Sequence, residues 1–192
     1  VRDVMSYLKF LANPLDEVSL LRIINTPQRG IGDASMEKLL NRAVKTGKKI
    51  WEVIPEALAE KEISQKTAKA IAGFQHLMAD FRQRFHNPSA PLSETLQSLL
   101  HDIDYESEIE KQYKAADQQL ARSAVLDECL QALREYEQRA PLPDLAEFLE
   151  ESSLNGNDRE FGEDDSFEQP AVKLMTLHSA KGLEFPRVYL VG

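Results

Sequence analysis

The sequence predicts a mainly α-helical fold that ends in a strand–turn–strand segment. Apolar residues recur at helical spacing through most of residues 1–151, with capping and breaking residues between the periodic runs. The periodicity then stops in an acidic stretch, and at Val172 the pattern changes to the β-branched and aliphatic residues typical of strands. We therefore expect a multi-helix domain followed by a short piece of a separate α/β domain.

The first two helices are expected on either side of Asn13-Pro14. Apolar residues recur at helical spacing from Val1 to Leu11, and the proline ends that helix. Asp16 can cap the second helix, because its side chain can accept from backbone N–H groups one turn later. The apolar face of this second helix holds Leu20, Leu21, Ile23 and Ile24.

A loop at residues 25–32 then leads to a third helix with Asp33 at its N-cap. The apolar positions of this helix are Met36, Leu39, Leu40, Ala43 and Val44. Thr46-Gly47 ends it, because glycine readily adopts the left-handed conformation common at helix C-termini. A shorter helical segment is expected from Trp51 to Ala59.

Ser64 can cap a long helix that ends before Pro88 and Pro91. One face of this helix carries apolar and aromatic residues at helical spacing, and aromatic residues in such a stripe usually belong to a core and not to a ligand site. The stripe comprises Ile71, Phe74, Leu77 or Met78, Phe81 and Phe85.

Three more helices are expected before residue 152. One follows Ser93, one spans about residues 118–139, and a short one is capped by Asp144. The inward face of the second of these holds Leu126, Cys129, Leu130, Leu133 and Tyr136. Residues 152–170 have no periodicity, and six carboxylates there accompany a single arginine, so we expect an acidic linker.

Composition indicates a globular protein of a reducing compartment. The only cysteine, Cys129, cannot form an internal disulfide, which favours a cytoplasmic location. No apolar run approaches the roughly 18 residues of a membrane span, so no membrane partner is expected. His76, His86 and His101 have no cysteine or acidic partners at ligand spacing, so we expect no metal site. Both termini fall inside predicted elements, and we expect the chain to be part of a longer protein.

The net charge of −9 is unevenly distributed. Residues 1–50 carry nine Lys and Arg against five Asp and Glu, whereas the remainder carries a charge of −13. A uniformly basic nucleic-acid surface is therefore excluded. If the protein meets DNA, the first fifty residues are the favoured contact surface; the alternative is ordinary variation of surface charge.

The loop Arg29-Gly30-Ile31-Gly32 is a candidate phosphate site. Two glycines allow backbone N–H groups to face outward, and the start of the next helix adds partial positive charge. Such an element would contact the DNA backbone and not the base edges. The alternative is a tight corner between two helices with no ligand.

The segment at residues 172–192 places several anion-seeking donors on one connector between two strands. Thr176, His178, Ser179 and Lys181 lie between the strands, and Gly182 allows a close approach of the backbone to a ligand. Connectors at strand ends hold phosphates in many α/β proteins. The alternative is an ordinary polar turn between buried strands.

The run from Thr176 to Phe185, TLHSAKGLEF, resembles motif V of superfamily-one DNA helicases of the UvrD/Rep/PcrA type. The run NTPQRGIG at residues 25–32 is similar to the segment that opens the family's inserted 2B domain. The resemblance implies a 2B-type helical domain at residues 15–151 and an acidic linker at 152–170. Residues 1–14 would leave the RecA-like motor domain 2A, and residues 171–192 would return to it.

The resemblance also implies roles for individual residues. Thr176 and His178 would contact single-stranded DNA. Glu184, Lys181 and Gly182 would belong to the ATP site. Duplex DNA would be contacted through Thr26, Arg29, Gly30, Ile31 and Gly32.

The parent implied by the resemblance is an ATP-dependent 3′→5′ DNA helicase that uses ATP and Mg²⁺. It would act on duplex DNA with a single-stranded junction and could meet repair or replication proteins. The 192 residues contain no GxxxxGK[ST] phosphate loop, so this chain alone is expected to be inactive and to hold no cofactor. Two alternatives remain: a non-catalytic DNA- or protein-binding regulatory module, and part of a RecB-like helicase–nuclease.

Overall fold

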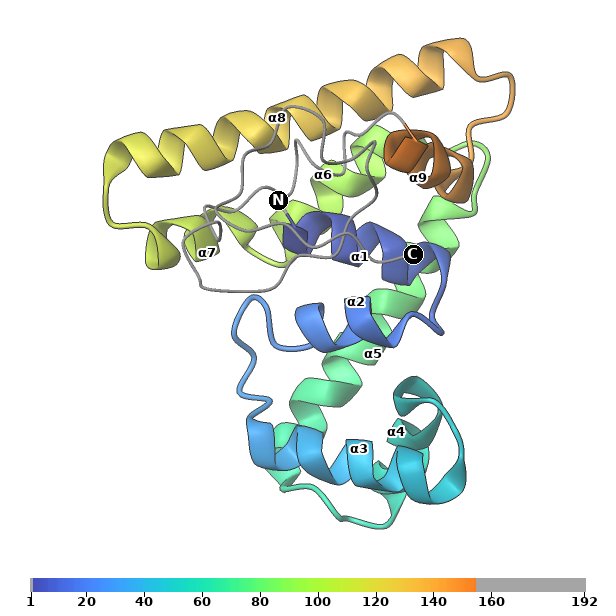
Figure 1. The fold of residues 1–192 in the computed structure, drawn as a ribbon, viewed down its shortest axis with the longest axis vertical. Coiled ribbons are helices and arrows are strands. Elements are labelled where there is room, and N and C mark those ends of the chain that lie inside the picture. The colour runs from blue at the N-terminus through green and yellow to red at the C-terminus, as the bar shows by residue number, and fades with distance from the viewer. Residues whose placement is uncertain (1, 155–192) are drawn as a thin grey trace, which may run out of the picture. The chain divides into compact units, whose positions relative to one another are not determined.

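The computed structural model describes residues 2–154, and within them it contains nine helices and no strand (Figure 1). The mainly helical prediction is confirmed for this part of the chain. The predicted strand–turn–strand segment at 171–192 and residues 155–170 of the predicted linker lie outside the described residues. The helices are α1 Arg2–Ala12, α2 Glu17–Ile23, α3 Asp33–Thr46, α4 Ile50–Ala59, α5 Gln65–Phe85, α6 Leu92–Asp102, α7 Tyr105–Gln112, α8 Ala116–Arg139 and α9 Leu145–Leu154.

Several helix ends have the predicted caps. The carboxylate of Asp16 accepts from the Ser19 N–H at 3.1 Å, and the hydroxyl of Ser64 accepts from the Thr67 N–H at 3.2 Å. Asp144 accepts from two N–H groups in the first turn of α9. Gly47 follows α3 with a φ of +67°, the left-handed conformation predicted for it.

Other boundaries differ from the predictions. The N-cap of α3 is Gly32, and Asp33 is already helical. Ser93 lies inside α6, where its N–H and hydroxyl both donate to the carboxylate of Glu137, at 2.9 and 2.7 Å. The short helix α7 was not predicted, because Tyr105 and Ile109 are its only buried residues. Helix α9 continues to Leu154, beyond the boundary expected at 151.

Helix α1 lies at the centre of the packing. It contacts α2, α5 and α9, and Val4, Tyr7 and Leu8 on it have no exposed surface. The assignment of this helix to motor domain 2A stays a prediction, but its side chains form part of the same core as those of α5.

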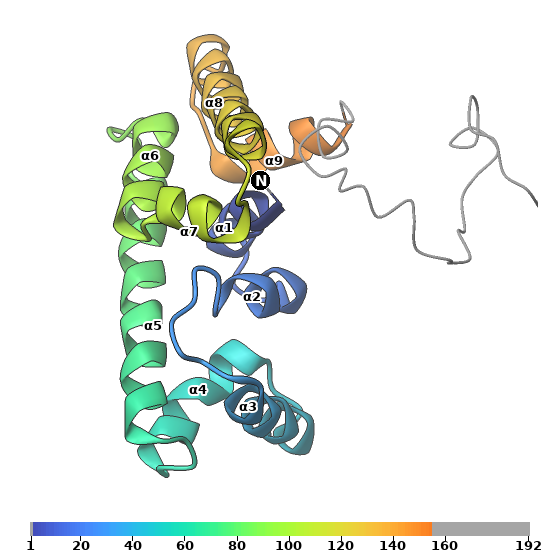
Figure 2. The same ribbon diagram turned by 90° about the vertical axis from the view of Figure 1, so that its left-hand side faces the viewer.

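Helix α5 extends from the region of α3 and α4 to α6, which it contacts (Figure 2). Its buried face contains Ile71, Phe74, Met78, Phe81 and Phe85, so Met78 and not Leu77 completes the predicted stripe. On α8 all five predicted inward residues are buried. Burial raises the pKa of the Cys129 thiol to about 11, so this cysteine is a neutral core residue at neutral pH.

Helix α3 buries less than its sequence pattern suggests. Leu39 and Ala43 are buried, whereas Leu40 is 38% exposed and Val44 is 81% exposed. The reason is that α3 packs mainly on α4, so only one narrow face is covered. Across the described helices, no segment combines the length and the hydropathy of a membrane span.

Candidate nucleic-acid interface

The loop that joins α2 to α3 (Figure 1) makes several hydrogen bonds within the protein. Gly30 has a φ of +78°, which favours glycine at this position, and the Thr26–Pro27 peptide bond is cis. Gly30 and Gly32 are exposed, Thr26 and Arg29 are half-buried, and Ile31 is buried. The five residues predicted to contact the duplex therefore differ in their access to a ligand.

The side chain of Arg29 points inward. Its Nη1 donates to the carbonyl oxygens of Ile23 and Pro27, each at 3.0 Å. Its Nη2 donates to the hydroxyl of Tyr7, and its Cζ lies 5.1 Å from the ring centroid of Phe74. The guanidinium therefore joins the end of α2, the loop, α1 and α5.

Tyr7 extends this network from the core of α1. Its hydroxyl donates to the carbonyl oxygen of Thr26. Burial raises the pKa of Tyr7 to about 12, against the opposing effect of the Arg29 charge, so the hydroxyl remains protonated at physiological pH. Tyr7 can therefore accept from Arg29 and donate to the loop at the same time.

Asn25 fixes the loop backbone. Its Oδ1 accepts from the N–H groups of Arg29, at 2.8 Å, and Ile31, at 3.1 Å. The side chain of Ile31 is only 2% exposed. Ile31 thus anchors the loop to the core, because its side chain is buried and its N–H group donates to Asn25.

A row of backbone donors remains on the outer side of the loop. Within residues 2–154, the N–H groups of Gly30, Gly32, Asp33 and Ala34 have no acceptor. The Gly32 carbonyl accepts from the Ser35 and Met36 N–H groups and so begins α3. A Cβ atom built on Gly30 or Gly32 would meet nothing within 4 Å, so both glycines face open space. This geometry suits an anion held by backbone N–H groups at a helix N-terminus.

The positive charge of residues 1–50 is largely used within the protein. Arg22 pairs with Asp3 at 2.7 Å, and Lys49 pairs with Glu17 at 2.9 Å. Lys38 donates to the carbonyl oxygen of Glu62 at 2.8 Å. The charge excess that favoured this region as a DNA contact surface is therefore not an open basic patch, and the exposed backbone donors are the stronger feature.

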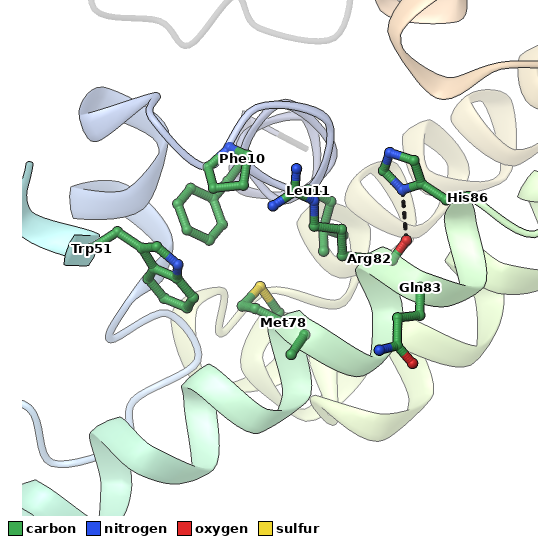
Figure 3. A pocket seen from close by; sticks show the side chains of 9 residues that line it. Phe10, Leu11, Trp51, Met78, Arg82, Gln83 and His86 are labelled. Atoms are coloured by element: carbon green, nitrogen blue, oxygen red, sulfur yellow. Dashed lines mark hydrogen bonds between the residues drawn. The ribbon is translucent and has the colours of Figure 1, made fainter. Parts of the chain in front are cut away.

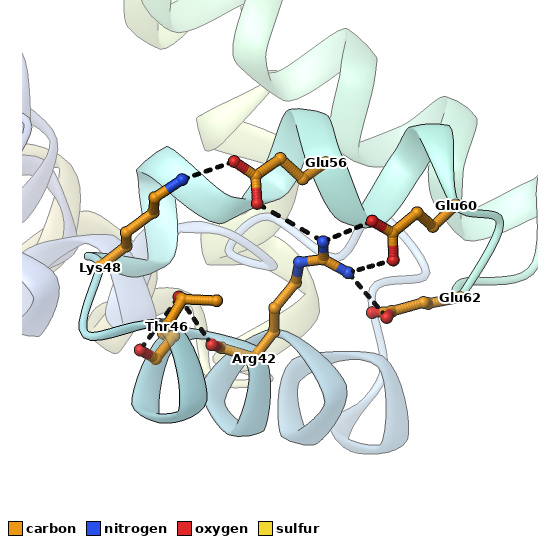
Figure 4. Close-up of polar contacts among 7 residues, drawn as sticks. Arg42, Thr46, Lys48, Glu56, Glu60 and Glu62 are labelled. Carbon is orange, nitrogen blue, oxygen red and sulfur yellow. Dashed lines mark hydrogen bonds and ion pairs between the residues drawn. The ribbon is translucent and has the colours of Figure 1, made fainter.

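Arg42 fixes α3 to the end of α4 (Figure 4). Its guanidinium is 2.7 Å from carboxylate oxygens of Glu60 and Glu62 and 3.4 Å from Glu56. Lys48 pairs with the other oxygen of Glu56 at 2.6 Å. The bond from Arg42 lowers the pKa of Glu60, and bonds from Lys48 and then Arg42 lower the pKa of Glu56. This cluster sets the direction of α3 and hence of its N-terminus.

Replacing Arg42 with methionine is expected to lower the melting temperature, because three carboxylates then lie together without their shared cation. The decrease in melting temperature should exceed that caused by Lys45→Met, which removes an exposed cation from the same helix. In the folded protein the pKa of Glu56 and of Glu60 lies below the ordinary value of 4.5. The stabilisation that their ion pairs give is therefore present above pH 4.5 and is lost as the pH falls below it. Thermal unfolding between about pH 7 and pH 3 tests this; equal losses for both variants at neutral pH would contradict it.

The sequence reasoning missed the residues that support the loop. Asn25 had a local signal, since asparagine commonly bonds nearby backbone N–H groups in turns. Tyr7 and Phe74 had none, because they are distant in sequence from Arg29. The motif V residues Thr176, His178, Lys181, Gly182 and Glu184 lie outside the described residues. In the part that the structure describes, no three His, Cys, Asp or Glu residues are grouped so as to hold a metal ion.

Comparison with known proteins identifies the family. The family model for the UvrD-like helicase C-terminal domain matches residues 1–192. The chain is 32% identical over 195 residues to DNA helicase II of Escherichia coli and 36% identical over 214 residues to ATP-dependent DNA helicase UvrD1 of Mycobacterium leprae. It is 31% identical over 194 residues to ATP-dependent DNA helicase PcrA of Bacillus subtilis. Each match covers 100% of this chain and 26% of the relative. The resemblance found in the sequence is therefore confirmed: the chain belongs to the UvrD-like helicase C-terminal domain family.

Proposed function

We propose that this chain is the 2B domain, with flanking parts of motor domain 2A, of an ATP-dependent 3′→5′ DNA helicase. Its role is to hold duplex DNA ahead of the motor through the α2–α3 loop. The observation that carries this proposal is the row of exposed N–H groups at Gly30, Gly32, Asp33 and Ala34. Three relatives that match the whole chain are named as DNA helicases, which supports the same function.

The chemistry of the loop suits a contact with the phosphate backbone. Four N–H groups on adjoining turns can donate to phosphate oxygens, and Gly30 carries no side chain that would hinder their approach. None of these donors reaches a base edge, so the contact is independent of DNA sequence. A domain that holds any duplex ahead of a motor requires this kind of contact.

The carboxylate of Asp33 opposes phosphate binding, because it is exposed in the first turn of α3. Asp33→Asn is therefore expected to increase duplex affinity about threefold, through loss of one like-charge repulsion. Glu37→Gln removes an exposed carboxylate one turn further along α3 and should have a smaller effect. Fluorescence anisotropy with a duplex that has a single-stranded junction measures both. A gain for Glu37→Gln but not for Asp33→Asn would place the phosphate elsewhere.

The motor function is proposed for the parent protein. There, Glu184, Lys181 and Gly182 would contribute to an ATP site with Mg²⁺, and Thr176 and His178 would contact the tracked strand. A strand connector that touches both nucleotide and DNA would couple closure on ATP to movement of the DNA. The test joins this chain to its upstream motor domain and measures DNA-stimulated ATP hydrolysis and unwinding. Absence of both activities would overturn the motor assignment, whereas the chain alone should be inactive.

A second candidate function is a regulatory module that docks a partner protein. A pocket between α1, α4 and α5, which none of the α2–α3 loop residues lines, favours it. Variants at Gly32 separate the two candidates, since only the duplex-contacting role requires that position.

A further inference from the structure

A cavity of about 420 Å³ lies between α1, α4 and α5 (Figure 3). Behind its walls lie Phe10, Leu11 and Met78, which are at most 2% exposed. Its accessible apolar surface comes from the half-buried Pro14 and Trp51 and from the exposed Ala79. The volume falls within the roughly 300–1,000 Å³ of ligand pockets. The space therefore suffices for a large apolar side chain, and the duplex-contacting residues proposed above take no part in it.

The pocket has a cationic rim. Figure 3 shows the side chain of Arg82 reaching from α5 toward α1, with His86 further along the chain. Arg82 is exposed, and no carboxylate of residues 2–154 lies within ion-pair distance of it. The ring Nδ1 of His86 lies 2.7 Å from the Arg82 carbonyl oxygen, which holds the imidazole at the end of the helix.

The pocket also lacks negative charge. None of its lining residues is Asp or Glu, although the chain carries 32 of them and a net charge of −9. Most of the surface therefore repels an anionic ligand, whereas this site combines an apolar floor with an available guanidinium. Such complementarity favours a ligand that is both acidic and apolar.

A peptide fits this chemistry better than a nucleic acid does. Tracking a DNA strand requires a row of cations, and base stacking requires an open aromatic face. Here Arg82 is the only Lys or Arg among the lining residues, and the Trp51 ring already contacts Phe10 and Phe74 edge-to-face, at centroid distances of 4.9 and 6.2 Å. We propose that this pocket binds an acidic peptide segment of a partner protein, with one large apolar side chain inserted beside Trp51 and a carboxylate paired with Arg82.

Trp51 provides the readout, because it is the only tryptophan of the chain. The probe is a short synthetic peptide with a central phenylalanine flanked by aspartates and glutamates. Its addition should change the tryptophan emission of the 192-residue chain saturably. A peptide with serine in place of phenylalanine, and one with lysines in place of the acids, should each bind at least about tenfold more weakly.

A matched pair of variants locates the site. Ala79 and Ala72 are both exposed alanines on α5, but only Ala79 lines the pocket. Ala79→Glu should weaken binding of the acidic peptide by at least about tenfold, whereas Ala72→Glu should leave it unchanged. In a second pair, Arg82→Glu should weaken binding of the peptide and Lys69→Glu should leave it unchanged. Circular dichroism verifies that all four variants fold.

The outcomes separate this proposal from the DNA-binding role. Gly32→Asp should leave peptide binding unchanged. The proposal is overturned if the peptide does not alter the emission, or if Ala79→Glu and Ala72→Glu bind it equally. It is also overturned if the peptide does not bind, while a single-stranded oligonucleotide binds and Ala79→Glu reduces its affinity. The pocket is then a nucleic-acid site.

Discussion

Replacing Gly32 with aspartate is expected to weaken duplex binding by at least about tenfold while leaving the fold as stable as before or slightly more so. Gly32 is the N-cap of α3 with a φ of −84°, and a Cβ atom there meets nothing within 4 Å. Aspartate is a favoured N-cap residue, so the side chain can accept from the first turn of the helix. The same carboxylate covers the proposed phosphate position and repels the ligand. Anisotropy with a junction duplex and urea unfolding measure the two effects.

Two other substitutions at Gly32 separate charge from access. Gly32→Asn covers the N–H groups of the first turn of α3 without adding a charge. Its loss of duplex affinity should lie between those of the aspartate and alanine variants. Gly32→Ala leaves these groups open, and its affinity should stay close to that of the unmodified protein. If the aspartate variant binds duplex DNA as tightly as the alanine variant, the loop does not hold a phosphate.

Replacing Arg29 with alanine should destabilise the fold by at least about 2–3 kcal/mol, because a single hydrogen bond from a charged donor is worth about 1.5–3 kcal/mol and several are lost together. The carbonyl oxygens of Ile23 and Pro27 and the hydroxyl of Tyr7 would lose their donor. Arg29→Lys should recover little, since a single ammonium cannot reproduce the planar donor array or its stacking. Urea unfolding midpoints of the two variants test this expectation.

The salt dependence of duplex affinity shows whether Arg29 positions the loop or contacts a phosphate. Removing a phosphate-bound cation lowers the slope of log affinity against log salt by about 0.9. Arg29 is bonded within the protein, so its variants should bind duplex DNA more weakly with an unchanged slope. A reduced slope in a variant of unchanged stability would make Arg29 a phosphate ligand.

Local sequence predicted most of the helices because their ends depend on nearby residues. Asp16, Ser64 and Asp144 each bond an N–H group two or three positions later, so the signal and its partner lie in one window. Helix α7 was missed because it buries only two residues. The exposure of Val44 could not be predicted, since periodicity marks an apolar face but not the neighbour that covers it.

The candidate site was predicted only in outline. The two glycines indicated a loop with outward N–H groups, and Gly30 and Gly32 do face open space. A cation beside them suggested a DNA contact, but Arg29 finds acceptors on α2 and on Tyr7, which lies 22 residues earlier. The balance of charges in residues 1–50 could not show which cations remain available to a ligand. Composition counts the cations, whereas only the folded chain shows that Arg22, Lys38, Arg42, Lys48 and Lys49 already have partners.

Amide chemical shifts of the ¹⁵N-labelled chain during titration with a junction duplex test the central claim most directly, because they report on the N–H groups themselves. The largest changes are expected at Gly30, Gly32, Asp33 and Ala34, whose N–H groups have no acceptor in the described part of the chain. Arg29 and Ile31, whose N–H groups already donate to Asn25, should shift less. Saturable binding with the largest shifts on another helix, and none at these four amides, would contradict the account.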